Sequence, residues 1–266
     1  MRVIRASRSA TVNEITEVMK EVTKGSVCSR TVRRVMKKLG YDCRVAVKKP
    51  LLTRQHMYVR YRWCLERRLW KDEWKRIFFS DESMIRQYPD GRVRIWRLSH
   101  EKYDMDCVVP RVQGGGISIM VWGMFSFDGV GPLEFVEGSM DSRQYIGVLD
   151  THVLGYLAYN PTYTFQQDNA SCHKSKMTKS WMQENNMPVL EWPARSPDLS
   201  PIENLWHIVK AKIRSSGRTA KTKQELFQLF HAAWLEIPVE ECYELIDSMP
   251  RRMEACIAAR GGPTKY

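Results

Sequence analysis

Hydrophobic side chains recur every three or four positions in two short stretches near the start of the chain, which predicts two helices. The first follows Thr11, which forms a capping-box pattern with Glu14. The second extends from Ser29, the expected N-cap, to Leu39, and Gly40 ends it. Its apolar stripe consists of Val32, Val35, Met36 and Leu39, and its other faces carry Arg30, Arg33, Arg34, Lys37 and Lys38.

Two helices joined by a glycine-containing turn, with the second helix basic, are typical of a helix-turn-helix, whose second helix enters the major groove of DNA. Taken alone, the pattern fits a solvated surface helix equally well. From Thr53 to about Arg76 the chain is again helical in pattern, with tyrosines and tryptophans among basic residues. A helical linker along a nucleic-acid backbone has this composition, and so does an ordinary connecting helix.

The pattern changes at Ile77, where short hydrophobic strands begin. Strands are predicted at residues 77–81, 93–98, 117–125, 133–136, 163–167 and 189–192, and helices at 142–159, at 175–185 and from Pro201 onward. The three glycines at 114–116 read as a loop, because no Gly-Lys-Ser/Thr of a P-loop follows them. A hairpin followed by alternating helices and strands predicts a mixed α/β domain.

Composition narrows the class of protein. No run of about 18 apolar residues and no apolar secretory leader is present, so we expect a soluble intracellular protein without a membrane partner. The seven cysteines are scattered and never form a C-x-x-C pair, which makes a disulfide framework or a zinc site an unfavoured interpretation.

Charge is distributed unevenly along the chain. Residues 1–76 carry 21 Lys and Arg against 7 Asp and Glu, a net of +14, whereas residues 77–266 carry 21 against 23. A basic segment of this kind suits a polyanion, and DNA or RNA is the usual partner. An anionic membrane surface is the alternative, but it would require a large apolar face opposite the charge.

Three acidic residues occupy positions that suit metal-dependent phosphodiester chemistry. Such chemistry needs divalent ions on both the attacking and the leaving oxygen, and Mg²⁺ prefers oxygen ligands. Asp81 and Asp168 each follow a predicted strand, although a turn or cap aspartate explains either one alone. Glu203 has its own alternative, because Ser200, Pro201 and Glu203 form a capping-box pattern.

Helical spacing bears on Glu203. Residues Ile202, Leu205, Trp206 and Val209 form the expected buried stripe, and another face carries Glu203, His207, Lys210 and Arg214. One carboxylate followed by cations at successive turns could present a metal ligand with phosphate contacts beside it.

Three separated segments resemble the catalytic blocks of Tc/mariner superfamily transposases. They are FFSDES at 78–83, FQQDNASCH at 165–173 and WPARSPDLSPIENLW at 192–206. The 34 residues between Asp168 and Glu203 are similar to the Asp-Asp-34-Glu spacing of the Tc branch. The segment GGGISIMVWGMFS and the ending IDSMPRRMEACIAARGGPTKY also resemble that branch, so the resemblance covers essentially the whole chain.

The resemblance implies an RNase H-like catalytic domain at residues 77–266, preceded by a helix-turn-helix segment at 1–50 and a basic helical linker at 51–76. It implies that Asp81, Asp168 and Glu203 bind two Mg²⁺ or Mn²⁺ ions and act in cut-and-paste transposition. The implied partners are double-stranded DNA, as transposon inverted repeats and as target, and a second copy in a homodimer; the expected location is the nucleus. The residues expected to contact DNA are Arg30, Arg33, Arg34, Lys37, Lys38, Lys48, Lys49, Lys210 and Arg214.

The sequence departs from the family pattern at its start. Tc-branch transposases usually open with two helix-turn-helix units joined by a basic linker, and only the second unit is visible here. We therefore expect intact chemistry with weakened recognition of transposon ends. A truncated or host-recruited DNA-binding protein without transposition activity is the alternative, and an RNase H-like nuclease acting on RNA or hybrids is a third.

Four further polar residues lie near the three carboxylates in sequence. Glu82 is expected on the surface, because it points away from Asp81 if the strand continues, and Asp198 is expected to form a turn. His173 and His207 could contact DNA or a leaving oxygen, but satisfied structural histidines are the favoured interpretation.

Overall fold

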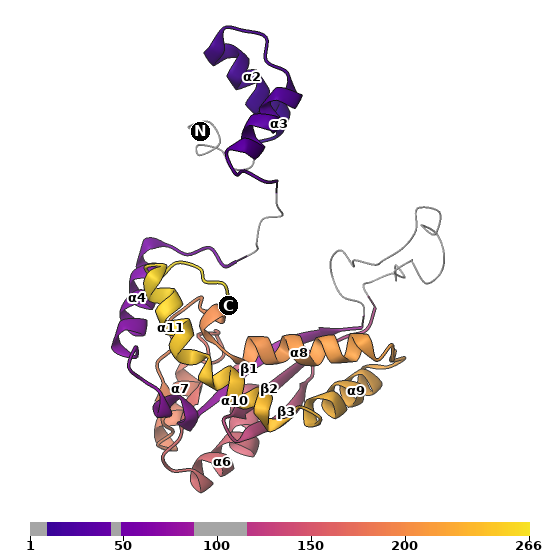
Figure 1. The fold of residues 1–266 in the computed structure, drawn as a ribbon. Helices are drawn as coiled ribbons and strands as arrows, with labels where there is room; N and C mark the ends of the chain where they lie inside the picture. The colour runs from indigo at the N-terminus through magenta and orange to yellow at the C-terminus, as the bar shows by residue number, and fades with distance from the viewer. Residues whose placement is uncertain (1–9, 44–48, 88–115) are drawn as a thin grey trace. The chain divides into compact units, whose positions relative to one another are not determined.

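The computed structural model describes residues 10–43, 49–87 and 116–266, and the chain divides into two compact units, residues 1–49 and residues 50–266 (Figure 1). The strand expected at 93–98, the first two glycines of the triple glycine and Lys48 lie outside the described residues. The functional division expected at residues 50 and 76 stays a prediction.

The first unit contains α2 (Val12–Thr23) and α3 (Ser29–Lys38). The predicted capping box forms, since Glu14 N donates to Thr11 Oγ1 at 3.2 Å and Thr11 N donates to the Glu14 carboxylate at 2.6 Å. The expected cap of α3 is wrong by one position, because Cys28 takes the extended N-cap conformation and Ser29 is already helical. Ile15 and Val32 are buried within the unit.

The second unit contains a five-stranded mixed sheet in the order β3-β2-β1-β4-β5. β1 pairs antiparallel with β2, β2 antiparallel with β3, and β1, β4 and β5 are parallel. The strands are β1 (Ile77–Arg86), β2 (Ser118–Ser126), β3 (Gly129–Val136), β4 (Thr164–Gln166) and β5 (Val189–Leu190). β1 is twice as long as predicted, so Asp81 lies in the middle of the strand and not at its end.

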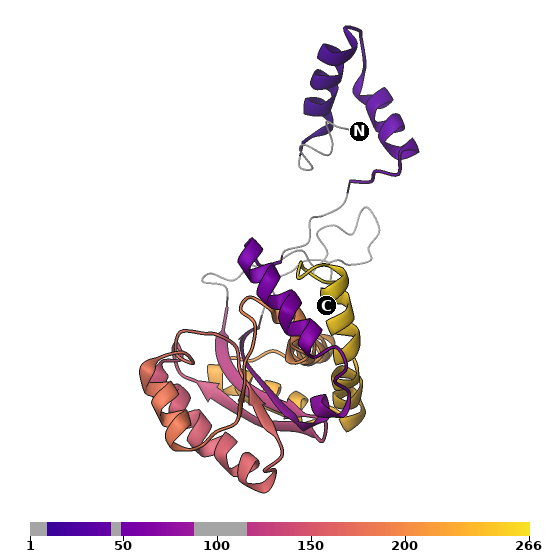
Figure 2. The same ribbon diagram turned by 90° about the vertical axis from the view of Figure 1, so that its left-hand side faces the viewer.

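Helices cover both faces of this sheet, as Figures 1 and 2 show. One layer consists of α4 (Arg54–Glu66), α8 (Ile202–Ser215), α9 (Lys223–Leu235), α10 (Val239–Asp247) and α11 (Met249–Ala258). The other consists of α5 (Ser142–Val148), the π-helical η5 (Leu149–Val153), α6 (Leu154–Tyr159) and α7 (Lys176–Glu184). None of the described helices is long and apolar enough to cross a membrane.

Alternation along β1 assigns its side chains to the two layers. Phe79 packs in the core under α8, and its neighbour Phe78 packs in the core under α5 and α6. Successive strand residues face opposite sides of a sheet, so Asp81 shares the side of Phe79 and Glu82 shares the side of Phe78. This alternation decides which neighbours each acidic side chain can reach.

The helix α4 belongs to the second unit and packs against α11. Thr53 caps it by accepting from His56 N at 3.2 Å, and Arg60, Trp63 and Cys64 are its buried residues. The short 3-10 helix η1 (Asp72–Arg76) follows and leads into β1, with Trp74 fully buried.

Candidate active site

Asp81 extends from the centre of β1 toward α8. The indole Nε1–H of Trp206 donates to Asp81 Oδ2 at 3.1 Å. Gly123, which pairs with Asp81 across the sheet, leaves room for that ring, because a Cβ there would lie 2.7 Å from the Trp206 indole. Burial raises the pKa of Asp81 well above its ordinary value, and the charges of Glu203 and Glu82 raise it further.

Asp168 lies two residues beyond β4, as the sequence predicted for a side chain at a strand end. Its Oδ1 accepts from Ala170 N at 2.8 Å and forms an ion pair with His173 Nδ1 at 2.8 Å, and the same ring nitrogen lies 3.4 Å from the Asp168 carbonyl oxygen. Burial alone would raise the pKa of Asp168, but these hydrogen bonds and the nearby cationic charge lower it. Its side chain is half exposed.

Glu203 lies in the first turn of α8, and the capping box that could have explained it does not form. Pro201 occupies the N-cap, and Ser200 N donates to Pro197 O at 3.0 Å in the 3-10 helix η6 (Pro197–Leu199). The Ser200 hydroxyl is buried without a hydrogen-bond partner among the described residues. Glu203 is therefore not engaged in holding its own helix.

One cavity of about 530 Å³ is lined by all three carboxylates, together with residues of the loop before α8. The three come from a strand, a strand-end loop and a helix that are distant in sequence. Burial raises the pKa of Glu203, to which the charge of Asp168 also contributes, while Lys210 opposes the shift. Carboxylates that disfavour one another's ionised form around one cavity suit a site that holds a cation.

Glu82 lies on the opposite side of β1 and is not a surface residue, which corrects the sequence prediction. Its carboxylate accepts from His173 Nε2 at 3.2 Å, and its side chain is 17% exposed.

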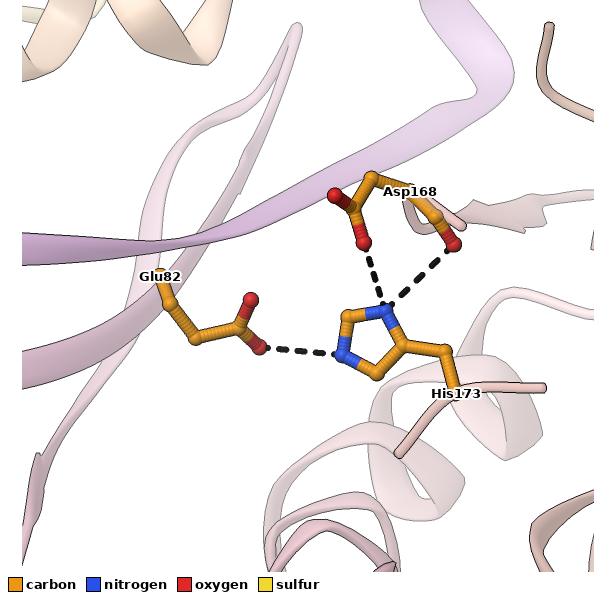
Figure 3. A group of neighbouring side chains, drawn as sticks. All are labelled: Glu82, Asp168 and His173. Atoms are coloured by element: carbon orange, nitrogen blue, oxygen red, sulfur yellow. Dashed lines mark hydrogen bonds and ion pairs between the residues drawn. The ribbon is translucent and has the colours of Figure 1, made fainter. Parts of the chain in front are cut away.

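His173 is buried and bridges Glu82 and Asp168, as Figure 3 shows. Burial alone would lower the pKa of His173, but its hydrogen bonds with the two carboxylates raise it to about 10. A satisfied structural histidine was the favoured interpretation, and this geometry agrees with it.

The cationic face of α8 is only partly exposed. Lys210 Nζ donates to Ser83 Oγ on β1 at 2.8 Å, and burial lowers its pKa. Arg214 and His207 are exposed. Lys210 and Arg214 line a second cavity of about 580 Å³, next to Arg218. In the first unit, Arg30, Arg33, Arg34, Lys37 and Lys38 are all exposed on α3, and Lys49 is exposed after it.

Asp198 is a buried ion-pair partner as well as a member of the turn η6, which the turn prediction did not foresee. Arg60 donates from both terminal nitrogens to its two oxygens, each at 2.8 Å. Thr264, near the C-terminus, donates from N and Oγ1 to Asp198 Oδ2 at 3.1 and 2.9 Å. Arg252 of α11 donates to the carbonyl of Asp198 at 3.1 Å and to Asn204 Oδ1 at 2.7 Å.

Two buried arginines therefore hold the loop that leads to Glu203, and sequence analysis missed both. Arg60 precedes Trp63 and Cys64 by three and four positions, so it shares their buried helical face. That spacing was a usable signal, but an arginine in a basic segment suggests a phosphate contact before it suggests burial.

Comparison with known proteins gives a consistent set of similarities. The family profile described as "DDE superfamily endonuclease" matches residues 76–227, and a helix-turn-helix profile described as "Transposase" matches residues 1–68. The Tc1 transposase of Caenorhabditis elegans is 34% identical over 273 residues, which cover 100% of this chain and 98% of the relative. The Tc3 transposase of the same organism is 33% identical, and the match covers 91% of this chain and 73% of that relative.

Solved structures resemble this chain in fold. A Mos1 transposase paired-end complex with left transposon end has a TM-score of 0.80 at 19% identity and covers 99% of this chain and 78% of that chain. A Mos1 transposase catalytic domain, described with Raltegravir and Mg, has a TM-score of 0.62 at 19% identity. The match covers 81% of this chain and 100% of that chain. The sheet with helices on both faces is therefore an RNase H-like fold, as the resemblance implied.

Proposed function

This chain belongs to the Tc/mariner superfamily of DDE transposases, and we propose that Asp81, Asp168 and Glu203 are the carboxylates that hold its divalent metal ions. It is a DNA transposase, that is, a nuclease and strand transferase. The observation that supports the assignment is the convergence of three carboxylates, from β1, the loop after β4 and α8, on one cavity.

The donor set fits Mg²⁺ or Mn²⁺, because all three ligands are hard oxygen donors. Mg and Mn are also the metals named for the Mos1 catalytic domain. Two such ions, when bound, would activate water and neutralise charge on the attacking and leaving oxygens. The chain itself orients the ligands: Trp206 holds Asp81, the N–H of Ala170 holds Asp168, and the first turn of α8 carries Glu203.

The proposed reaction has two parts. Water attacks a phosphodiester at each end of the transposon, and the broken P–O bond leaves a 3′-hydroxyl. That hydroxyl then attacks a phosphodiester of the target duplex and displaces its 3′-oxygen. Lys210 and Arg214, which follow Glu203 along α8, are suited to hold the phosphates on either side of the reacting one.

We assign three further properties on the same basis. The DNA partners are the inverted repeats, bound by the basic helix α3 and its flanking lysines, and the target duplex. The assembly is a homodimer that pairs two ends, in keeping with the paired-end description of the Mos1 complex. The place of action is the nucleus, where the DNA substrate lies.

The function is tested by cleavage of a duplex that carries the inverted repeat flanking the gene. We expect nicking at the repeat end in Mg²⁺ or Mn²⁺, and its loss on addition of EDTA, because the carboxylates cannot act without cations. Gel electrophoresis of end-labelled strands measures the position and the rate of strand cleavage. Undiminished cleavage in EDTA, or faster cleavage of an RNA–DNA hybrid than of the duplex, would contradict the assignment.

Contact of α3 with phosphates is tested by the salt dependence of DNA binding. Replacing both Arg33 and Lys37 with glutamine should lower the slope of log K against log salt by about 1.8, since each lost contact removes about 0.9. The control replaces Lys20, in α2, and Lys24, at its C-cap, with glutamine, so that both variants lose two positive charges. Fluorescence anisotropy with a labelled duplex measures both; equal slopes for the two variants would rule out α3 as the contact surface.

A further inference from the structure

His173 is buried, with 2% of its surface exposed, between two acidic side chains on different elements. Its Nδ1 lies 2.8 Å from Asp168 Oδ1 and its Nε2 lies 3.2 Å from Glu82 Oε1. Figure 3 shows the ring between the two carboxylates, with Glu82 extending from β1. Neither Glu82 nor His173 is among the residues that line the cavity of the three carboxylates.

Asp168 and His173 lie in the same loop, between the end of β4 and the start of α7, and the Asp168 side chain is 52% exposed. A half-exposed aspartate samples several rotamers unless hydrogen bonds select one. Here Oδ1 accepts from Ala170 N and from His173, and in Figure 3 the other carboxylate oxygen points away from the ring. Two donors on one oxygen leave the second oxygen available to a metal.

The ring of His173 is itself held by two residues, Tyr145 and Glu82. Tyr145 packs against it with ring centroids 4.0 Å apart, and the Tyr145 hydroxyl donates to Gln167. The Glu82 carboxylate accepts a hydrogen bond from Nε2 of the ring. Rotation of the ring would break the contact with Glu82, so Glu82 and Tyr145 together direct Nδ1 toward Asp168.

We propose that His173, oriented by Glu82, is a positioning residue that holds the Asp168 carboxylate in the rotamer that binds metal. The inference rests on the proposed function, since it assumes that Asp168 is a ligand. Residues that orient metal-ligating side chains commonly change metal affinity by about 10–100-fold when they are replaced.

Two substitutions of His173 test the contributions of its two ring nitrogens separately. The amide nitrogen of asparagine lies near the position of Nδ1, whereas that of glutamine reaches the position of Nε2. His173→Asn therefore keeps the donor to Asp168 and loses the contact with Glu82, and His173→Gln does the reverse. The full chain is titrated with MnCl₂, and electron paramagnetic resonance measures free Mn²⁺, which is independent of cleavage activity.

We expect His173→Gln to bind Mn²⁺ about 10–100-fold more weakly than the wild type, and His173→Asn to stay within about threefold. Wild-type affinity in both variants, or an equal loss in both, would overturn the proposal, because neither result depends on the donor to Asp168. An equal loss is also what a metal bound directly by Glu82, Asp168 and His173 would produce, since those three groups could hold an ion themselves.

A second pair of variants covers the case in which changes at His173 prevent folding. Glu82→Gln keeps an oxygen acceptor for Nε2 and should bind Mn²⁺ like the wild type, whereas Glu82→Ala releases the ring and should bind about tenfold more weakly. Equal affinities for these two variants would overturn the role of Glu82. The variant Asp81→Asn distinguishes failure of the positioning role from failure of the metal site. If Asp81→Asn binds Mn²⁺ as tightly as the wild type, the proposed metal site is wrong, and the positioning role of His173 is wrong with it.

Discussion

Replacing Glu203 with glutamine is expected to slow DNA strand cleavage about a thousandfold or more while leaving the fold intact. Glutamine keeps the size of the side chain and removes its charge, which the proposed metal ions require. A thousandfold loss corresponds to about 4 kcal/mol of transition-state stabilisation, within the range that metal and electrostatic contributions supply. Cleavage of the end-labelled repeat duplex in Mg²⁺ measures the rate.

Stability should not fall along with the rate. Glu203 does not cap α8, and burial together with the charge of Asp168 raises its pKa despite the attraction of Lys210, so the folded state disfavours its ionised form. We expect the Tm to stay unchanged or to rise slightly. Glu184→Gln, the same change on an exposed position of α7, is the control and should cleave normally. Wild-type cleavage by Glu203→Gln would show that this residue is not part of the metal site.

Replacing Arg60 with methionine is expected to lower the free energy of unfolding of residues 50–266 by about 3–5 kcal/mol, because it leaves the Asp198 carboxylate buried without its cation. Arg60 has no exposed side-chain surface, and it also donates to the carbonyl oxygens of Gly261 and Gly262 at 2.8 and 3.2 Å. Urea unfolding followed by tryptophan fluorescence measures the change, since all nine tryptophans follow residue 49.

The matched control is Arg62→Met on the same helix. Arg62 is 57% exposed and lies 3.9 Å from Glu66, so its loss should change the free energy of unfolding by less than about 0.5 kcal/mol. If the two variants unfold at the same urea concentration, the pair of Arg60 and Asp198 does not stabilise the fold.

The same pair gives stability a pH dependence. Burial alone would raise the pKa of Asp198, but the hydrogen bonds and charge of Arg60 and the hydrogen bonds of Thr264 lower it. A carboxylate whose pKa is lower in the folded state stabilises the fold above its unfolded pKa of about 3.9, and this stabilisation is lost as the pH falls through the folded value. The stability advantage of the wild type over Asp198→Asn should therefore shrink below about pH 4.

The helices and strands were predictable where the pattern is local. The capping box at Thr11, the helix from Ser175 and the buried stripe of α8 all follow from spacing over a few residues, and the structure has them. The capping box at Ser200 failed because the loop before α8 uses the Ser200 N–H in a 3-10 turn. A sequence pattern of four residues cannot show that its donor is already taken.

The sequence by itself determined the fold class and the family, and it predicted the three carboxylates as metal ligands, because strand and helix periodicity and the catalytic blocks are all read along the chain. Only the tertiary structure decided what each carboxylate contacts. Trp206 reaches Asp81 across 125 positions, His173 reaches Glu82 across 91, and Arg60 reaches Asp198 across 138. Such partners are chosen by which side of the sheet a residue faces and by which helix packs there, and neither is specified by neighbours in sequence.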